Sequence, residues 1–124
     1  MPRRFLNDVI TTQVVTMSYA GTLVAGAGAL RWYAHKALTV LNVIISVGTA
    51  PTGASLIVDV NKNGTTMFST QGNRPTVAIS GFTDTSSVPD VTSIAAGDYL
   101  TIDIDQIGST IPGSNLTVQV IVSG

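Results

Sequence analysis

The sequence predicts one all-β domain, an antiparallel β-sandwich or barrel preceded by a short extended arm. Val, Ile and Thr make up 43 of the 124 residues, and side chains branched at Cβ favour strands over helices. Twelve Gly and five Pro interrupt the chain at short intervals, as expected for frequent turns. Several runs of strand length alternate between apolar and polar residues, and none repeats with the period of a helix.

The composition argues against several functional classes. With 44% hydrophobic and 10% charged residues, the chain does not have the composition of a disordered protein. Its net charge of −1 predicts no nucleic-acid partner, because phosphate binding requires an excess of Lys and Arg. The chain has no Cys, which excludes disulfides and favours assembly in a reducing cytosol. Polar residues interrupt the apolar run 37–47, and Asp8 interrupts the basic N-terminus, so we expect neither a membrane partner nor a cleavable signal.

We expect residues 1–8 to form the arm and residues 9–124 to form the sandwich. Residues 80–97 read as a connection rich in Ser, Thr, Pro and Asp, anchored by Val91 and Ile94. The expected strands lie, in chain order, at 9–16, 21–26, 28–33, 38–47, 56–61, 66–68, 76–79, 99–104 and 116–122.

Two of these runs carry the strongest local signals. The run 38–47 has apolar residues at both parities, Leu38 and Val40 first and then Val43, Ile45 and Val47. After the run 56–61, the pair Asn63-Gly64 predicts a two-residue hairpin, because a type I′ turn needs positive φ at both central residues.

The same hairpin segment resembles the first half of a calcium-binding EF-hand loop. Asp59, Asn61 and Asn63 have the right spacing, but Thr70 occupies the twelfth position, where that loop needs a bidentate Glu. Asp103 and Asp105 share one face of the strand 99–104 and its extension. With Asp98 or Asp59 they could bind calcium, but the alternation favours a solvated face opposite Leu100, Ile102 and Ile104.

The sequence predicts no enzyme. His35 is the only histidine, no nucleophile-elbow pattern accompanies it, and it reads as a surface or interface residue. Gly26-Ala27-Gly28 has neither the Lys nor the helix of a phosphate-binding loop. We therefore expect no catalytic residues, no metal site and no cofactor.

Two segments are candidates for binding a protein partner. The cluster Arg31-Trp32-Tyr33 is either a platform for glycans or partners, or packing in the core or between subunits, with packing favoured for Trp32. In the arm, Arg3 and Arg4 could pair with carboxylates of a partner while Phe5 fills a pocket.

Four segments, occurring in the order given, carry a family resemblance: Leu30–Tyr33, Ser46–Leu56, Val58–Thr65 and Ala95–Leu100. The stretch from Gly28 onward resembles a small β-domain that recurs in structural proteins of tailed bacteriophages. The hairpin at Asn63-Gly64, followed by Ala96-Gly97-Asp98-Tyr99 at the start of a late strand, is also similar to the jelly roll of C1q/TNF-type trimers. The second resemblance implies a jelly-roll sandwich packed around a threefold axis.

These resemblances imply a structural role. The first expectation is a phage capsid decoration (cement) protein, a homotrimer bound to the major capsid protein on the head surface and assembled in the host cytoplasm. The alternative is a tail or fibre module that recognises host-surface glycans through Trp32, Tyr33 and the carboxylates near Asp103. For the trimer, we expect the runs 38–47 and 116–122 to face the axis, because apolar surface of this extent normally marks an interface.

Overall fold

A computed structural model describes residues 11–124 of the chain. Within this range lie ten strands and one short 3₁₀ helix, the segment η1 at Gln71–Asn73. The strands are β1 (Thr12–Thr22), β2 (Arg31–Tyr33), β3 (Leu38–Ser46), β4 (Leu56–Lys62), β5 (Thr65–Thr66), β6 (Thr76–Val77), β7 (Thr83–Thr85), β8 (Ser93–Ile94), β9 (Tyr99–Gln106) and β10 (Ser114–Ser123).

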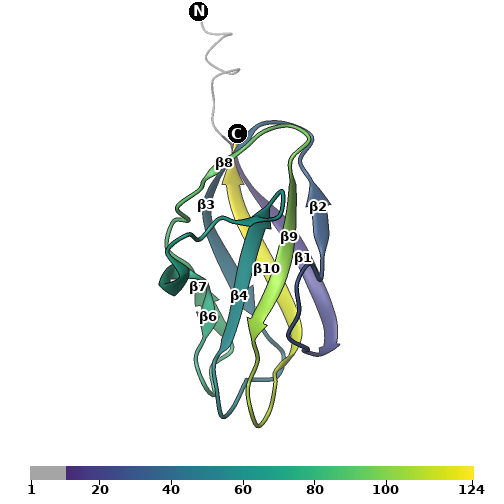
Figure 1. Cartoon of the computed structure of the whole chain (residues 1–124), viewed down its shortest axis with the longest axis vertical. Coiled ribbons are helices and arrows are strands. Elements are labelled where there is room, and N and C mark those ends of the chain that lie inside the picture. Colours follow the sequence, from purple (N-terminus) through teal and green to yellow (C-terminus); the bar gives the residue numbers. More distant parts are fainter. Residues whose placement is uncertain (1–10) are drawn as a thin grey trace, which may run out of the picture.

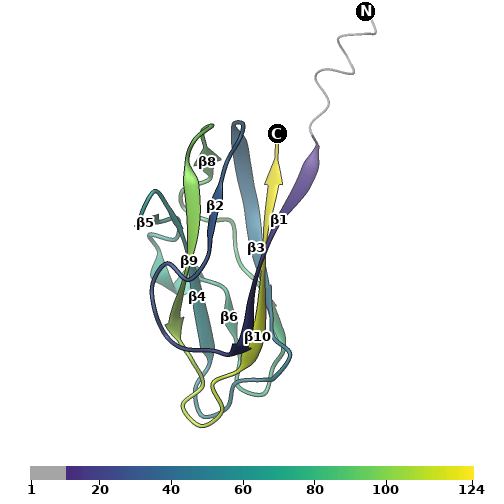
Figure 2. The same ribbon diagram turned by 90° about the vertical axis from the view of Figure 1, so that its right-hand side faces the viewer.

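The strands form two antiparallel sheets stacked face to face (Figures 1 and 2). We call them sheet A, with the order β1-β10-β3-β7, and sheet B, with the order β2-β9-β4-β5. The short strand β8 also pairs with β3, and β6 also pairs with β4. Strands β1 to β4 alternate between the two sheets, as do β9 and β10, which is the connectivity of a jelly roll. The predicted all-β antiparallel jelly-roll sandwich is confirmed.

The core lies between the sheets and is built from alternate residues of the long strands. Each of these strands points every second side chain inward because the side-chain period of a strand is two. The long strands β3, β4, β9 and β10 therefore supply most of the fully buried aliphatic side chains: Val40, Val43, Ile45, Leu56, Val58, Val60, Leu100, Ile102, Ile104, Leu116, Val118, Val120 and Val122. Leu23, Met67 and Phe68 enter the core from the segments between strands.

A β-bulge explains the two parities in β3. In the pairing with β10, Ile121 lies opposite Asn42 while the next residue, Val122, lies opposite Val40. Leu41 is the extra residue and is exposed. The bulge lets β3 change parity without leaving the sheet, so both halves of the strand point into the core.

The predicted hairpin is confirmed. Lys62 pairs with Thr65, and Asn63 and Gly64 between them have φ of 52° and 87°. The Asn63 side chain also connects the turn to the start of β9 by hydrogen bonds. Its Oδ1 accepts a hydrogen bond of 3.0 Å from the Tyr99 N–H, and its Nδ2 donates one of 2.9 Å to Asp98. The turn thus fixes the start of β9 as well as the link from β4 to β5.

Several predicted boundaries are wrong. The first strand continues beyond 16 to Thr22 because Met17 and Tyr19 keep the inward alternation. The segment 21–26 is not an independent strand; Gly26 only forms an isolated bridge to Ile104. The connection 80–97 contains β7 and β8, two short strands that pair with β3, although Ile94 is buried and Val91 packs against the core as predicted. The arm at 1–8, its boundary with residue 9, and Arg3, Arg4 and Phe5 lie outside the described residues.

Replacing Gly64 by Val tests the hairpin. A β-branched side chain at a φ of 87° is strained, so we expect Gly64→Val to lower the free energy of unfolding by about 1–2 kcal/mol. Gly72 is the matched control, because a Cβ there meets nothing within 4 Å and its φ lies outside the left-handed region. Urea denaturation of both variants measures the difference, and equal effects would show that the turn is misassigned.

Candidate functional site

The predicted cluster Arg31-Trp32-Tyr33 forms strand β2 at the edge of sheet B, and the strand separates its members. Trp32 is half-buried and packs against the core, whereas Arg31 and Tyr33 on either side of it are exposed. This division follows from the alternation of side chains along a strand. The packing interpretation of Trp32 is therefore supported, and only Arg31 and Tyr33 are available on the outer face of sheet B.

Tyr99 joins them to form what we call the tyrosine–arginine cluster, consisting of Arg31, Tyr33 and Tyr99. Strand β2 pairs with β9 so that Tyr33 lies opposite Tyr99, and their ring centroids are 5.5 Å apart. The Arg31 guanidinium lies 4.4 Å from the centroid of the Tyr99 ring and donates a hydrogen bond of 3.1 Å to the Tyr33 hydroxyl. Cation–π attraction and this hydrogen bond hold the guanidinium in place, and the hydrogen bond raises the pKa of Arg31.

Sequence reasoning missed Tyr99 as a site residue. Its parity placed it on the outer face of strand 99–104, but only the β2–β9 pairing brings it to Arg31 and Tyr33. Asp98, next to Tyr99, accepts hydrogen bonds from the Asn63 side chain and from the Ala95 N–H, which lower the pKa of its carboxyl group. The cluster therefore stands beside a fixed amide and a carboxylate that stays ionised.

Beyond the cluster, the outer face of sheet B carries a row of carboxylates, each with a donor. Asp59 lies opposite Asp103 in the β4–β9 register. Asp59 accepts a hydrogen bond of 2.7 Å from the Thr66 hydroxyl, and Asp103 accepts one of 2.6 Å from the Asn61 side chain. Asp105 forms an ion pair of 2.7 Å with Arg74.

This arrangement corrects one prediction about the face. Asp105 is exposed and Asp103 half-buried, but Thr101, predicted to be solvated, is buried, as are Asp59 and Asn61 across the sheet. Thr101 lies between Arg31 and Asn61 in the register, so neighbouring strands flank it on both sides. Within residues 11–124, no group of three His, Cys, Asp or Glu side chains could hold a metal ion.

The outer face of sheet A has the opposite character, and we call it the uncharged face. It consists of the outward side chains of β1, β10 and β3, none of which is charged: Thr12, Val14, Thr16, Ser18, Ala20, Asn115, Thr117, Gln119, Ile121, Ser123, Thr39, Leu41, Asn42, Ile44 and Ser46. Val14, Ile121 and Asn42 form one cross-strand row near the middle. Val14 is 50% exposed and Leu41 is 37% exposed.

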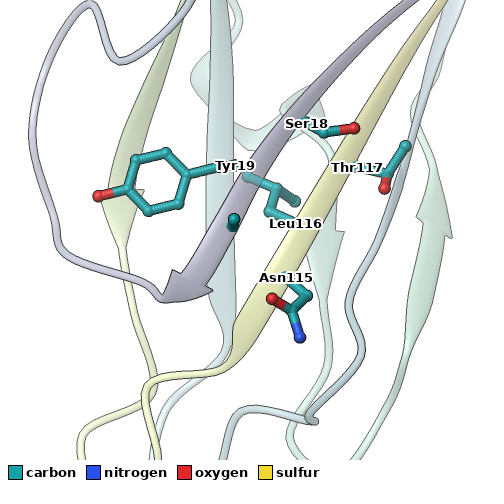
Figure 3. Close-up of a pocket in the computed structure, with 6 residues that line it drawn as sticks. Ser18, Tyr19, Asn115, Leu116 and Thr117 are labelled. Atoms are coloured by element: carbon teal, nitrogen blue, oxygen red, sulfur yellow. The ribbon is translucent and has the colours of Figure 1, made fainter.

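A hollow of about 240 Å³ lies beside the register shift between β1 and β10, and Figure 3 shows the side chains that line it. It is lined by Ser18, Tyr19 and Ala20 of β1 and by Asn115, Leu116 and Thr117 of β10. The register shifts here, between Tyr19 and Thr22, and the Asn115 side chain accepts a hydrogen bond of 2.8 Å from the Gly21 N–H. The hollow is large enough to receive a side chain of a packed partner.

No protein-family model matches the chain, and no curated protein matches it. No helix within residues 11–124 is long and apolar enough to cross a membrane.

The buried Asp59 predicts a pH dependence of stability. Desolvation raises the pKa of its carboxyl group, so ionised Asp59 opposes folding at neutral pH. The opposition disappears as the pH falls through the raised pKa toward the ordinary value of 3.8. We expect Asp59→Asn to raise the melting temperature at pH 7, as measured by calorimetry. This increase in melting temperature should become smaller as the pH falls toward 4.

Asp90 provides a control of opposite sign. A hydrogen bond from the Thr70 N–H lowers the pKa of Asp90, so its ionised form favours folding above pH 3.8, and this contribution is lost below that pH. Asp90→Asn should therefore lower the melting temperature at pH 7. Equal shifts for both variants would contradict the assignment for Asp59.

Proposed function

We propose that this protein is a non-enzymatic structural component of a phage virion, a decoration (cement) protein of the head surface that assembles as a homotrimer. The observation that carries the proposal is the uncharged face of sheet A. A sheet face that is open to water normally carries charged side chains. This face instead presents aliphatic side chains among Thr, Ser, Asn and Gln, namely Val14, Leu41, Ile44 and Ile121. This composition suits a surface that packs against protein.

Further copies of this chain are the proposed occupant of the uncharged face. A face without charge meets no like-charge repulsion when it approaches another copy of itself, and its aliphatic side chains gain from removal of water. The face is centred on β10, which contains the run 116–122, and on β3, which contains all but the last residue of the run 38–47. Both runs are predicted to lie at the trimer axis. The outward side chains of both runs belong to this face, whereas their inward side chains lie in the core.

The tyrosine–arginine cluster on the opposite sheet is the proposed contact with the capsid. The only ion pair within residues 11–124 joins Arg74 to Asp105, so the guanidinium of Arg31 has no acidic partner among the described residues. Because Arg31 is already held over Tyr99, its side chain loses less conformational entropy when it forms a new ion pair. A carboxylate of the major capsid protein is the partner that this geometry fits, with the arm residues Arg3, Arg4 and Phe5 as further predicted contacts.

One observation also supports the second candidate, a tail or fibre module that binds host glycans. Tyr33 is 57% exposed, and its ring lies beside the Tyr99 ring at an interplanar angle of 47°. An exposed tyrosine ring next to fixed carboxylates and amides suits a sugar ring. Trp32 does not contribute to this surface, because it packs toward the core.

A single charge in the uncharged face tests the assembly. Ile121 lies near the centre of this face, so we expect Ile121→Lys to abolish the threefold association at micromolar concentration, leaving particles whose number of chains is no longer a multiple of three. Thr65→Lys, at an exposed position in the β4–β5 hairpin, should leave the mass unchanged. Light scattering gives the number of chains. We expect a multiple of three for the unmodified protein, and a stable monomer would contradict the proposal.

Binding to phage heads tests the role of the cluster. Tyr33→Ala removes the hydroxyl that holds Arg31, so we expect its occupancy on heads of the matching phage to fall, as measured by sedimentation with the particles. Ser80→Ala, at an exposed position away from the cluster, is the control. Loss of binding to an oligosaccharide array with head occupancy unchanged would favour the glycan-binding module instead.

A further inference from the structure

Strand β1 is an edge strand without the usual protection. It spans 11 residues and, within residues 11–124, pairs only with β10, so that no described residue pairs with its other side. The other strands at the sheet edges, β2, β5, β6, β7 and β8, have two or three residues each. Proteins commonly protect edges by shortening them or by placing charges or Pro on them. The segment 12–22 contains neither a charged residue nor Pro.

The free side of β1 offers unpaired main-chain groups. The Gly124 N–H donates a hydrogen bond of 3.1 Å to the Thr11 carbonyl, and in an antiparallel ladder the residues bonded to one neighbour alternate with those pointing the other way. The N–H and C=O groups of Thr12, Val14, Thr16, Ser18 and Ala20 therefore point away from β10. Outside the sheets, no backbone hydrogen bond joins residues 12–20 to any other described residue.

We infer that the β1 strands of two copies of this chain pair antiparallel across a twofold axis, joining the two A sheets into one continuous sheet. A second β1 is the occupant that the structure favours, because every other sheet edge in the described part of the chain is too short to satisfy the free groups of an 11-residue strand. The absence of charge in β1 removes like-charge repulsion across the pair. The contact is isologous, so it closes after two chains and does not extend into a fibre.

The symmetry defines the register. Pairing that uses all of residues 12–20 places Thr16 opposite its own copy, with Val14 opposite Ser18. Because the main-chain groups of Thr16 point to the free side, Thr16 and its copy form a hydrogen-bonded pair, in which Cα atoms lie about 5.5 Å apart. That separation is within the range that a disulfide can bridge.

This inference is independent of the proposed packing of the uncharged face, because it depends on main-chain groups at the edge of β1 and not on outward side chains. Twofold pairing gives assemblies with an even number of chains, either two or, where trimers also form, six. The two proposals can therefore fail separately.

The chain contains no Cys, so a single introduced Cys can form a disulfide only with the same residue of another copy. We expect Thr16→Cys to form a covalent dimer on mild oxidation, seen on a denaturing gel without reductant. Thr39→Cys is the matched control, since Thr39 is also exposed on the uncharged face but lies on β3, which has strand neighbours on both sides. Equal cross-linking of the two variants, or none of Thr16→Cys, would overturn the inference.

A main-chain variant removes the pairing without adding charge. Thr16→Pro deletes an N–H that points away from β10, a position at which an edge strand tolerates Pro. We expect Thr16→Pro to raise the dissociation constant of the pair at least about fivefold relative to Thr16→Val, which keeps the N–H. Thermal unfolding confirms that both variants fold, and analytical ultracentrifugation measures association. Equal association of the two folded variants would contradict strand pairing. If Thr16→Pro does not fold, the Cys comparison decides.

Discussion

The alternation of side chains in β3, with the one-residue bulge at Leu41, is the constraint on which the rest of the structure depends. The strand lies between β10 on one side and β7 and β8 on the other. Without the bulge, either Leu38 and Val40 or Val43 and Ile45 would point to the outer face, because a slip of one residue reverses every side chain. Burial of a large aliphatic side chain contributes about 1.5–3 kcal/mol, so losing either pair would remove a substantial part of the stability of a small domain.

The bulge also shapes the surface. It leaves Leu41 exposed beside Asn42, whose Oδ1 atom is buried and has no hydrogen-bond partner among the described residues. The two sheets differ accordingly. On sheet B, Asp59, Asp103 and Asp105 are each matched by a donor from a neighbouring element. On sheet A the outward side chains of β1, β10 and β3 carry no charge and form no ion pairs. This is the arrangement expected where another protein surface replaces water.

Local pattern was enough to predict much of the fold, and the limits have physical causes. Strict alternation in the β4, β9 and β10 runs and the turn chemistry of Asn63-Gly64 identified those elements from neighbouring residues alone. Strands β7 and β8 are two or three residues long, too short to show a period, and exist because β3 offers them partners. The tyrosine–arginine cluster required the β2–β9 register, so the sequence identified Arg31 and Tyr33 but not Tyr99. Trp32 was grouped with them because adjacency in sequence hides the opposite orientation of neighbouring strand residues.

The distribution of edge lengths connects the fold to assembly. A jelly roll has two sheets and therefore four edges, and three of them here end in strands of two or three residues. Short edges leave few unpaired main-chain groups and so need little further protection. Strand β1 departs from this pattern because it is a long edge strand. Its outward side chains form one side of the uncharged face. Because main-chain pairing would align two such faces in one sheet, an edge that is a liability in an isolated domain becomes a means of enlarging the packing surface in an assembly.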